Sequence, residues 1–384
     1  MTSNTKNILT YIFLIFCFIA TALFVFRGMF TPLGDESFGR VWHYFLDWND
    51  FGFSRRGLLG TILEITQLTN FINDPYSLAY LTYTIILISF FIILAKVIIE
   101  SRIGDNGTLI IFGLIFSPGL FMQFGYTTGN LDVLLFLLIT IIIFYLRNIY
   151  LILSFIFVGL LTHEMFIIFI PFFIFIRYIS TEELSLKIPI TFLKPTIILV
   201  ISIIVFLIIN ICGTLDVPQV QFESIMQNQL GRASYKHPLW SGFYEVSSSV
   251  VTNISNTHKL LIRDFNDLSN LDILLACVPY LYLICLLIIF FKRADLLFLH
   301  RVLLVLAMLL PLTLSFLAND IYRWAGFSIK LCLIACIYLA SKNKIYFKKI
   351  DGILLSLFVF SGPYGDSSLL RPMPVIQFIF LDHY

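Results

Sequence analysis

The chain has 384 residues, of which 59% are hydrophobic and only 12% carry a charge. Soluble globular domains of this size do not have such a balance, so the composition predicts a membrane protein with many spans. The formal net charge of +2 comes from short basic clusters between apolar runs and not from a basic stripe, which excludes nucleic acid as a partner. The six cysteines lie in or next to apolar runs without a Cys-x-x-Cys pair, so we interpret them as small packing residues.

The apolar runs predict an all-α fold. With about 20 residues per span as a guide, the chain is expected to form a polytopic integral-membrane helical bundle with about 11 transmembrane helices. The predicted spans are residues 8–26, 77–98, 108–125, 131–146, 149–162, 165–180, 195–212, 271–291, 296–317, 325–340 and 350–362. The stretch 58–72 carries Glu64 and Gln67, so we predict a short interfacial or re-entrant helix there.

The basic clusters predict which side faces the cytoplasm. Positive residues near span ends favour the cytoplasmic side. This rule assigns Lys292-Arg293 and the lysines from Lys342 to Lys349 to the cytoplasm. With the predicted spans, the N-terminus then also lies in the cytoplasm. We therefore expect a multi-pass protein of a bacterial-type inner (plasma) membrane. All of residues 1–384 are expected to form one transmembrane domain, with a long extracytoplasmic loop at 213–270 and C-terminal helices from 271–384.

Ionisable residues then collect on the extracytoplasmic side. Such groups are costly at membrane depth, and a face that collects them is a functional-site hypothesis by default. The candidate catalytic residues are Asp35 and Glu36, and the candidate substrate-binding residues are Arg55, Arg56, Asp132, His163, Glu164, Arg232, His237, Asp320 and Arg323.

The segment from Gly34-Asp35-Glu36 to Ser54-Arg55-Arg56-Gly57 is the densest part of this set. One interpretation is a surface loop whose aromatic residues lie at the lipid headgroups. The other is that a carboxylate acts as general base or metal ligand while the two arginines clamp a phosphate. The sequence predicts no particular cofactor, but the carboxylates of this segment are compatible with binding of a divalent cation.

A pattern across residues 10–180 resembles a known family. Gly129-Asn130-Leu131-Asp132 heads one span, Arg147-Asn148 forms a tight inward turn, and a Gly-Leu-rich helix ends at Thr162-His163-Glu164. This order resembles the module of GT-C-type membrane glycosyltransferases, which carry an acidic residue in the first extracytoplasmic loop, where Asp35 and Glu36 stand. The resemblance implies an N-terminal module over residues 1–180. Many members have Lys where this chain has His163-Glu164.

Three further groups have two interpretations each. His163 and Glu164 either form a hydrated polar turn or bind substrate, and because neighbours on a helix point roughly 100° apart, we expect at most one to be catalytic. Asp320 and Arg323 stand three apart, which favours an internal ion pair unless both face a cavity. Lys330 either extends to the interface or neutralises a phosphate.

The long loop carries amides, aromatic residues and cations, Arg232 and His237 among them. Such side chains fit a sugar, but they are also common in loops at the headgroup interface. No phosphate-binding Gly-rich loop, Ser-His-Asp order or zinc-binding His pair is present in the sequence, which argues against ATP-driven and protease chemistry.

The resemblance implies a glycosyltransferase of surface-polysaccharide assembly with a polyprenyl-(pyro)phosphate-linked donor. Polymerases that join lipid-linked repeats of O-antigen or capsule are similar in length, composition and the position of a long loop, and we favour that variant. A single-sugar GT-C transferase and a lipid-linked glycan flippase stay open as alternatives. Expected partners are the polyprenyl-linked sugar or oligosaccharide, membrane lipid and polysaccharide-assembly proteins.

Overall fold

The computed structural model describes residues 41–68, 72, 74–101, 130–179, 193–215, 217–230, 259, 270–316 and 321–356. The predicted spans 8–26 and 108–125 lie outside these residues, as do five candidate site residues. Those five are Asp35, Glu36, Arg232, His237 and Asp320.

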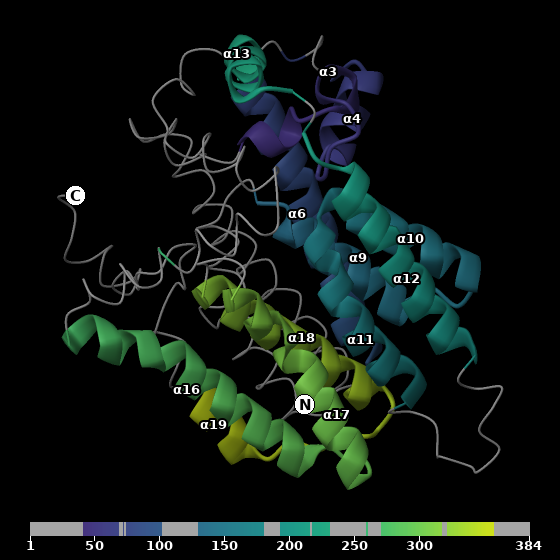
Figure 1. Ribbon diagram of the computed structural model, residues 1–384. Helices are drawn as coiled ribbons and strands as arrows, with labels where there is room; N and C mark the ends of the chain where they lie inside the picture. The colour runs from purple at the N-terminus through teal and green to yellow at the C-terminus, as the bar shows by residue number, and fades with distance from the viewer. Residues whose placement is uncertain are drawn as a thin grey trace.

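The described residues are mostly helical, and no strand occurs among them (Figure 1). Short elements come first: η1 (Val41–Tyr44), α3 (Trp48–Phe51) and α4 (Leu58–Ile65). They are followed by α6 (Pro75–Glu100), α9 (Asp132–Phe144), α10 (Ile149–Thr162), η2 (Glu164–Ile168), α11 (Phe169–Ile174), η3 (Phe175–Ile179), α12 (Leu193–Cys212) and α13 (Gln219–Leu230). The last are α16 (Asn270–Arg293), α17 (Phe298–Leu309), η5 (Leu310–Phe316), α18 (Ile321–Ser341) and α19 (Lys349–Ser356).

Four helical segments are long and apolar enough to cross a membrane. They are Pro75–Glu100, Leu193–Cys212, Phe298–Ser315 and Arg323–Ser341, and the helices Asp132–Phe144 and Ile149–Thr162 are apolar but shorter. Each predicted span that falls among the described residues overlaps a helix. The mostly helical fold is thus confirmed, whereas the total of about 11 crossings stays a prediction.

Several helix starts follow from their capping residues. Asp74 accepts a hydrogen bond from the backbone N–H of Ser77 at 2.9 Å, and Pro75 occupies the first helical position of α6. Asn148 caps α10 by accepting from the N–H of Tyr150 at 2.8 Å. The short connection between α9 and α10 therefore matches the predicted tight turn at Arg147-Asn148.

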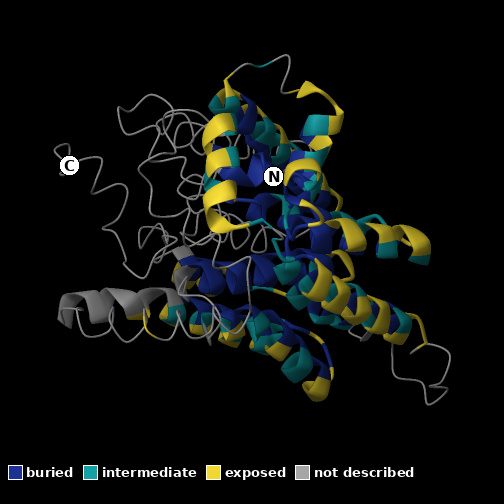
Figure 2. Cartoon of the chain, turned by 45° about the horizontal axis from the view of Figure 1, so that its top comes forward, coloured by how far each residue is buried: buried dark blue, intermediate teal, exposed yellow. Residues whose placement is uncertain are grey.

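α18 lies at the centre of the bundle and α12 at its edge. Of the residues in the most apolar part of α18, 89% are buried. The corresponding share in α12 is 22%. Ile204, Leu207 and Ile211 of α12 are exposed. Exposed positions follow the outer sides of the helices, while the interior is buried (Figure 2). Apolar side chains on an outer helix face are what a lipid environment favours.

Aromatic pairs show that α9 and α18 run in the same direction. The ring centres of Phe136 and Phe327 lie 5.1 Å apart near the helix starts, and those of Phe144 and Tyr338 lie 5.6 Å apart near the ends. α6 runs in this direction too, because Lys96 near its end lies next to Tyr145, which directly follows α9. The Nζ of Lys96 is 5.1 Å from the centre of the Tyr145 ring. The first residues of α9 and α18 are thereby brought to one end of the bundle.

That end also carries the short helices α3, α4 and α13. Figure 1 shows α3, α4 and α13 at the top of the bundle and α16, α17 and α19 at the bottom. α4 is amphipathic and eight residues long, so a short helix is present within 58–72, and its interfacial or re-entrant position stays a prediction. The candidate site is at the end that carries α3 and α4.

Candidate functional site

Arg56 and Glu164 form an ion pair between the first described segment and the start of η2. The Nε of Arg56 donates to Oε2 of Glu164 at 3.0 Å, and Nη2 donates to Oε1. Both side chains are only 14% exposed. A two-point contact of this kind fixes both groups, so the partner of Arg56 is a carboxylate of the protein itself.

The turn that carries Arg56 has an unusual backbone. Arg56 has φ 68°, in the left-handed region that non-glycine residues rarely adopt. The indole N–H of Trp48 donates to the carbonyl oxygen of Ser54 at 3.0 Å and holds the start of the turn. A Cβ on Gly57 would lie 2.5 Å from the Trp48 ring, so only glycine fits there. Such strain persists where surrounding contacts over-determine it, and it is frequent at functional sites.

This turn sends the two adjacent arginines to different partners. Nη1 of Arg55 donates to Oδ1 of Asn210 at 3.1 Å, and the backbone N–H of Arg55 donates to the carbonyl oxygen of Gly213 at 2.9 Å. Arg55 therefore attaches the turn to the end of α12. The interpretation in which both arginines grip one phosphate side by side does not match this geometry. Asn210, a lone amide in the apolar run 195–212, was missed by the sequence analysis.

Asp132 and Arg323 form a second ion pair, between the starts of α9 and α18. Nε of Arg323 donates to Oδ2 of Asp132 at 2.8 Å, and Nη2 donates to Oδ1 at 2.6 Å. Nη2 also donates to Oδ1 of Asn130 at 3.0 Å. All three residues are at most 5% exposed. Arg323 thus pairs with Asp132, and the internal pair with Asp320 that the spacing favours concerns a residue outside the described ones.

Lys330 lies about two turns further along α18, inside the bundle. Its Nζ is 5.2 Å from the ring centres of both Phe136 and Phe327, and the residue is 1% exposed. It also interacts electrostatically with Asp132. A cation between two aromatic faces is stabilised where it stands. The Lys330 side chain therefore stays inside the bundle and does not extend to the interface, which was one of its two interpretations.

The turn at His163 and Glu164 is irregular, which lets both residues belong to one site. His163 ends α10 in an extended conformation, with φ −162° and ψ 123°, and its Nδ1 accepts from the N–H of Met165 at 3.3 Å. A Cβ on Gly159 would lie 2.6 Å from the Phe166 ring, so the turn packs tightly against the helix that precedes it. The 100° separation expected for helical neighbours does not apply here.

Charge states at this turn follow from burial and neighbours. Burial lowers the pKa of His163 to about 4, so the imidazole is neutral at pH 7. The 3.3 Å contact between its Nδ1 and Oε2 of Glu164 is then not an ion pair. The Glu164 carboxyl is buried, but the Arg56 guanidinium outweighs that effect and holds its pKa well below the usual range.

These residues form one polar cluster at the end of an apolar bundle. We use the name polar cluster for Arg55, Arg56, Asn130, Asp132, His163, Glu164, Arg323 and Lys330. Electrostatic contacts connect Arg55 to Glu164, and His163 to both Asp132 and Arg323. The described charged side chains of the cluster are four cations and two carboxylates, gathered at one end of the bundle.

No group of three or more His, Cys, Asp or Glu side chains within the described ranges is arranged to hold a metal ion. The carboxylates of Asp132 and Glu164 are each engaged by a guanidinium. Three further acidic side chains belong to this end: Asp47 caps α3, Asp50 lies on α3 and Glu64 lies on α4. Gln229 of α13 donates to Oδ2 of Asp50 at 2.8 Å, so this part of the predicted long loop docks on α3.

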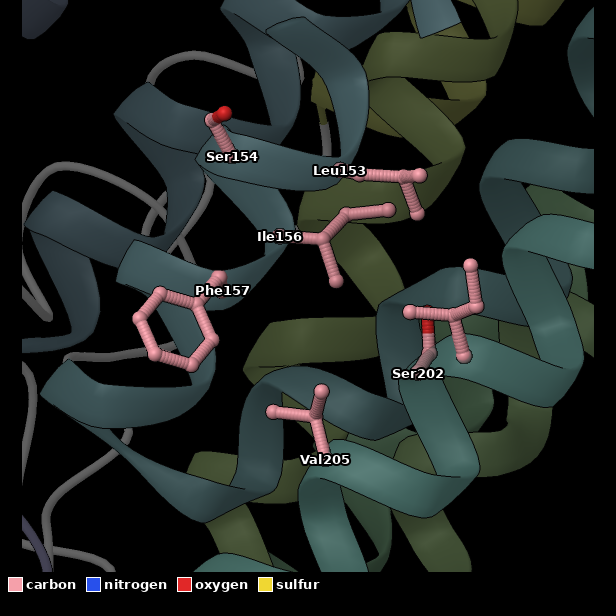
Figure 3. A pocket seen from close by; sticks show the side chains of 7 residues that line it. Leu153, Ser154, Ile156, Phe157, Ser202 and Val205 are labelled. Atoms are coloured by element: carbon pink, nitrogen blue, oxygen red, sulfur yellow. The ribbon is translucent and has the colours of Figure 1, made fainter. Parts of the chain in front are cut away.

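An apolar hollow of about 270 Å³ lies between α10 and α12 (Figure 3). Its lining is Leu153, Ser154, Ile156, Phe157, Ile201, Ser202 and Val205. Both serine hydroxyls donate to carbonyls of their own helices, at 2.9 Å for Ser154 and 2.6 Å for Ser202. The hollow therefore presents an apolar wall, on the same two helices whose ends carry His163 and Asn210.

Comparison of the chain with models of known protein families, with curated proteins and with solved structures finds no match.

Proposed function

We propose that this chain is an integral-membrane glycosyltransferase of surface-polysaccharide assembly, with a polyprenyl-(pyro)phosphate-linked sugar as donor and a repeat-unit polymerase as the favoured variant. The carrying observation is the concentration of buried charged side chains at one end of an apolar helical bundle. Buried ionised groups are costly, so an apolar chain that keeps several of them together indicates a site for a charged ligand. A lipid-linked phosphate or pyrophosphate is an anion that arginine and lysine side chains bind well.

The geometry supports particular roles for these cations. Arg323 and Lys330 lie about two turns apart on α18, and both interact with Asp132. A donor phosphate bound next to this pair would contact both cations. Arg56 is already oriented by Glu164 and by its constrained turn. Fixed cations near a leaving phosphate stabilise the charge that develops as the bond to the sugar breaks. In this proposal, the first part of the polyprenyl chain lies in the apolar hollow between α10 and α12.

The two carboxylates of the polar cluster are poor candidates for the general base. Asp132 and Glu164 each accept two hydrogen bonds from an arginine, and a carboxylate held in this way has little tendency to take a proton. We therefore keep Asp35 as the proposed base and Glu36 as its neighbour. Both precede the described residues.

In the proposed reaction, the oxygen of an acceptor hydroxyl attacks the anomeric carbon of the donor sugar. The hydroxyl proton passes to the Asp35 carboxylate. The bond between the anomeric carbon and the phosphate oxygen breaks, and the polyprenyl (pyro)phosphate leaves with the electron pair. Transfer of a whole lipid-linked repeat gives a polymer, and transfer of one sugar gives the single-sugar alternative.

The experiment is substitution in the native host, followed by analysis of the surface polysaccharide. Asp35→Asn and Lys330→Met are the test variants. Asp50→Asn is the matched control, because Asp50 is a carboxylate of the same segment that lies outside the polar cluster. Immunoblots of the membrane fraction confirm that each variant is present.

The expected result is a glycan reduced to one repeat in both test variants and unchanged chain length in the control. A glycan that lacks a single sugar would favour the single-sugar transferase. Lipid-linked repeats that accumulate on the cytoplasmic leaflet would favour the flippase. Normal polymer in Asp35→Asn would refute the catalytic role of that residue.

A further inference from the structure

Two connections that are far apart in the sequence form one surface at the end of the bundle opposite the polar cluster. Ala294 and Ile345 form an antiparallel bridge, and both are buried. The N–H of Asp295 donates to the carbonyl oxygen of Lys344 at 2.7 Å, and the N–H of Tyr346 donates to that of Arg293 at 3.3 Å. The α16–α17 and α18–α19 connections are thereby held together. We call residues 292–298 and 342–354 the basic platform.

One ion pair inside the basic platform has no net charge. Arg293 donates to both oxygens of Asp351, from Nε at 2.7 Å and from a terminal nitrogen at 2.8 Å. Oδ2 of Asp351 also accepts from the N–H of Lys348 at 2.7 Å. Asp351 therefore holds the start of α19 against the end of α16, and its negative charge is neutralised by Arg293.

The remaining charges of the basic platform are strongly positive. Five lysines remain once Arg293 and Asp351 are paired: Lys292, Lys342, Lys344, Lys348 and Lys349. Lys344 is partly exposed and the other four are exposed, and within the described residues of the platform the one further carboxylate is Asp295, also exposed. The surface thus offers several ammonium groups to an anionic partner.

Large apolar side chains are exposed among these lysines. Leu297 is 61% exposed, Phe298 71% and Tyr346 63%. Ile350 and Leu354 of α19 are also exposed. Lysines interleaved with exposed aromatic and aliphatic residues on a short helix are typical of segments that lie in the headgroup region of a bilayer. In water this apolar surface would be unfavourable.

From this arrangement, we propose that the basic platform binds anionic phospholipid headgroups of the adjacent membrane surface. The lysine ammonium groups contact the headgroup phosphates, while Phe298, Tyr346 and the exposed face of α19 reach the boundary of the acyl chains. Anionic lipid fits better than a soluble anion because a soluble anion would leave the apolar side chains in water. This binding site is separate from the proposed transferase site and does not depend on it.

The test compares lipids bound to the full chain in nanodiscs that contain phosphatidylcholine and phosphatidylglycerol. Native mass spectrometry counts the lipids retained on release, and thermal unfolding is followed in parallel. We expect the wild type to retain phosphatidylglycerol preferentially. The fourfold variant K292Q/K344Q/K348Q/K349Q should lose this preference by at least about fivefold, the contribution of one lysine near an anionic surface.

Lys96→Gln is the matched control, since Lys96 is an exposed lysine of α6 outside the platform, and it should keep the preference. In about 1 M salt, where the screening length is about 3 Å, the wild type should lose it, which tests the proposal even where the fourfold variant does not fold. A fourfold variant that folds and retains phosphatidylglycerol like the wild type would overturn the proposal. Equal stabilisation of the wild type by inorganic phosphate would do the same.

Discussion

The bidentate contact between Arg56 and Glu164 holds in place Arg56, whose backbone is already strained by the turn. Removing one partner leaves the other charge buried without compensation, which costs about 3 kcal/mol or more. Arg56→Gln and Glu164→Gln are therefore each expected to be clearly destabilising, and the double variant R56Q/E164Q less so than the sum of the two. Thermal unfolding of the purified chain in detergent measures all three, and strictly additive losses would contradict a direct pair.

We expect the protein to lose stability in mild acid because of the buried His163. Its pKa is lowered to about 4 in the folded chain, against an ordinary value of 6.5. Above pH 6.5 the stability from the neutral imidazole is fully present. As pH falls from 6.5 to 4, the unfolded chain takes up a proton that the folded chain does not, and about 2 kcal/mol is lost by pH 5.

The measurement for His163 is unfolding between pH 7 and pH 5 in the wild type and in His163→Asn. The variant cannot titrate at this position, so its stability should change less over that interval. Glu164 does not interfere, because its pKa is held well below the ordinary value and its contribution is lost only at lower pH. Equal slopes in the two proteins would show that His163 is not the titrating group.

At the level of single residues, the sequence predicted members of the polar cluster but not their partners. Arg56, Asp132, Arg323 and Glu164 were all candidates because charge in an apolar chain is conspicuous. The pairs join residues 108 and 191 positions apart. Spacing along one helix carries no information about such contacts, so it favoured Asp320 as the partner of Arg323. Asn130 and Asn210, which are neutral, carried still less signal.

Helix α4 depends on close packing against the segment before it. A Cβ added at Gly60 would lie 2.2 Å from the carbonyl oxygen of Leu46. Backbone atoms cannot move aside as a flexible side chain can, so Gly60→Ala should separate α4 from this segment and destabilise the turn at Arg56. The measurement is limited proteolysis near residue 56 together with thermal unfolding.

Ile65→Ala on the same helix is the control for Gly60→Ala. Ile65 is 75% exposed, so its truncation should leave both readouts close to those of the wild type. A Gly60→Ala protein as resistant to protease as the wild type would refute the packing argument.

At the level of helices, length and continuous apolarity were the reliable signals. α6, α12 and α18 overlap predicted spans because a long apolar run has few alternatives to a helix in a membrane. The run 165–180 was predicted as one helix, but it is divided into η2, α11 and η3. That division depends on the extended conformation of His163 and on packing, which hydrophobicity does not describe.

The molecule as a whole has two chemically different ends. One carries the polar cluster with α3, α4 and α13, and the other carries the basic platform. Parallel packing of α6, α9 and α18 places the starts of these helices at the first end and their last residues at the second. If these helices cross a membrane, the two ends must face opposite compartments, and the lysines favour the cytoplasm for the basic platform.

Thiol labelling tests this arrangement at the scale of the molecule. Ile65→Cys and Tyr346→Cys introduce exposed thiols at the two ends, in a chain whose natural exposed cysteines have been replaced by alanine. A membrane-impermeant maleimide added to spheroplasts should label the first position directly. It should label the second only after permeabilisation, because the bilayer separates it from the reagent. The cysteine-replaced parent gives the background signal. Labelling of both positions in spheroplasts would place the two ends on one side, and the polar cluster would then not be separated from the lysines by a bilayer.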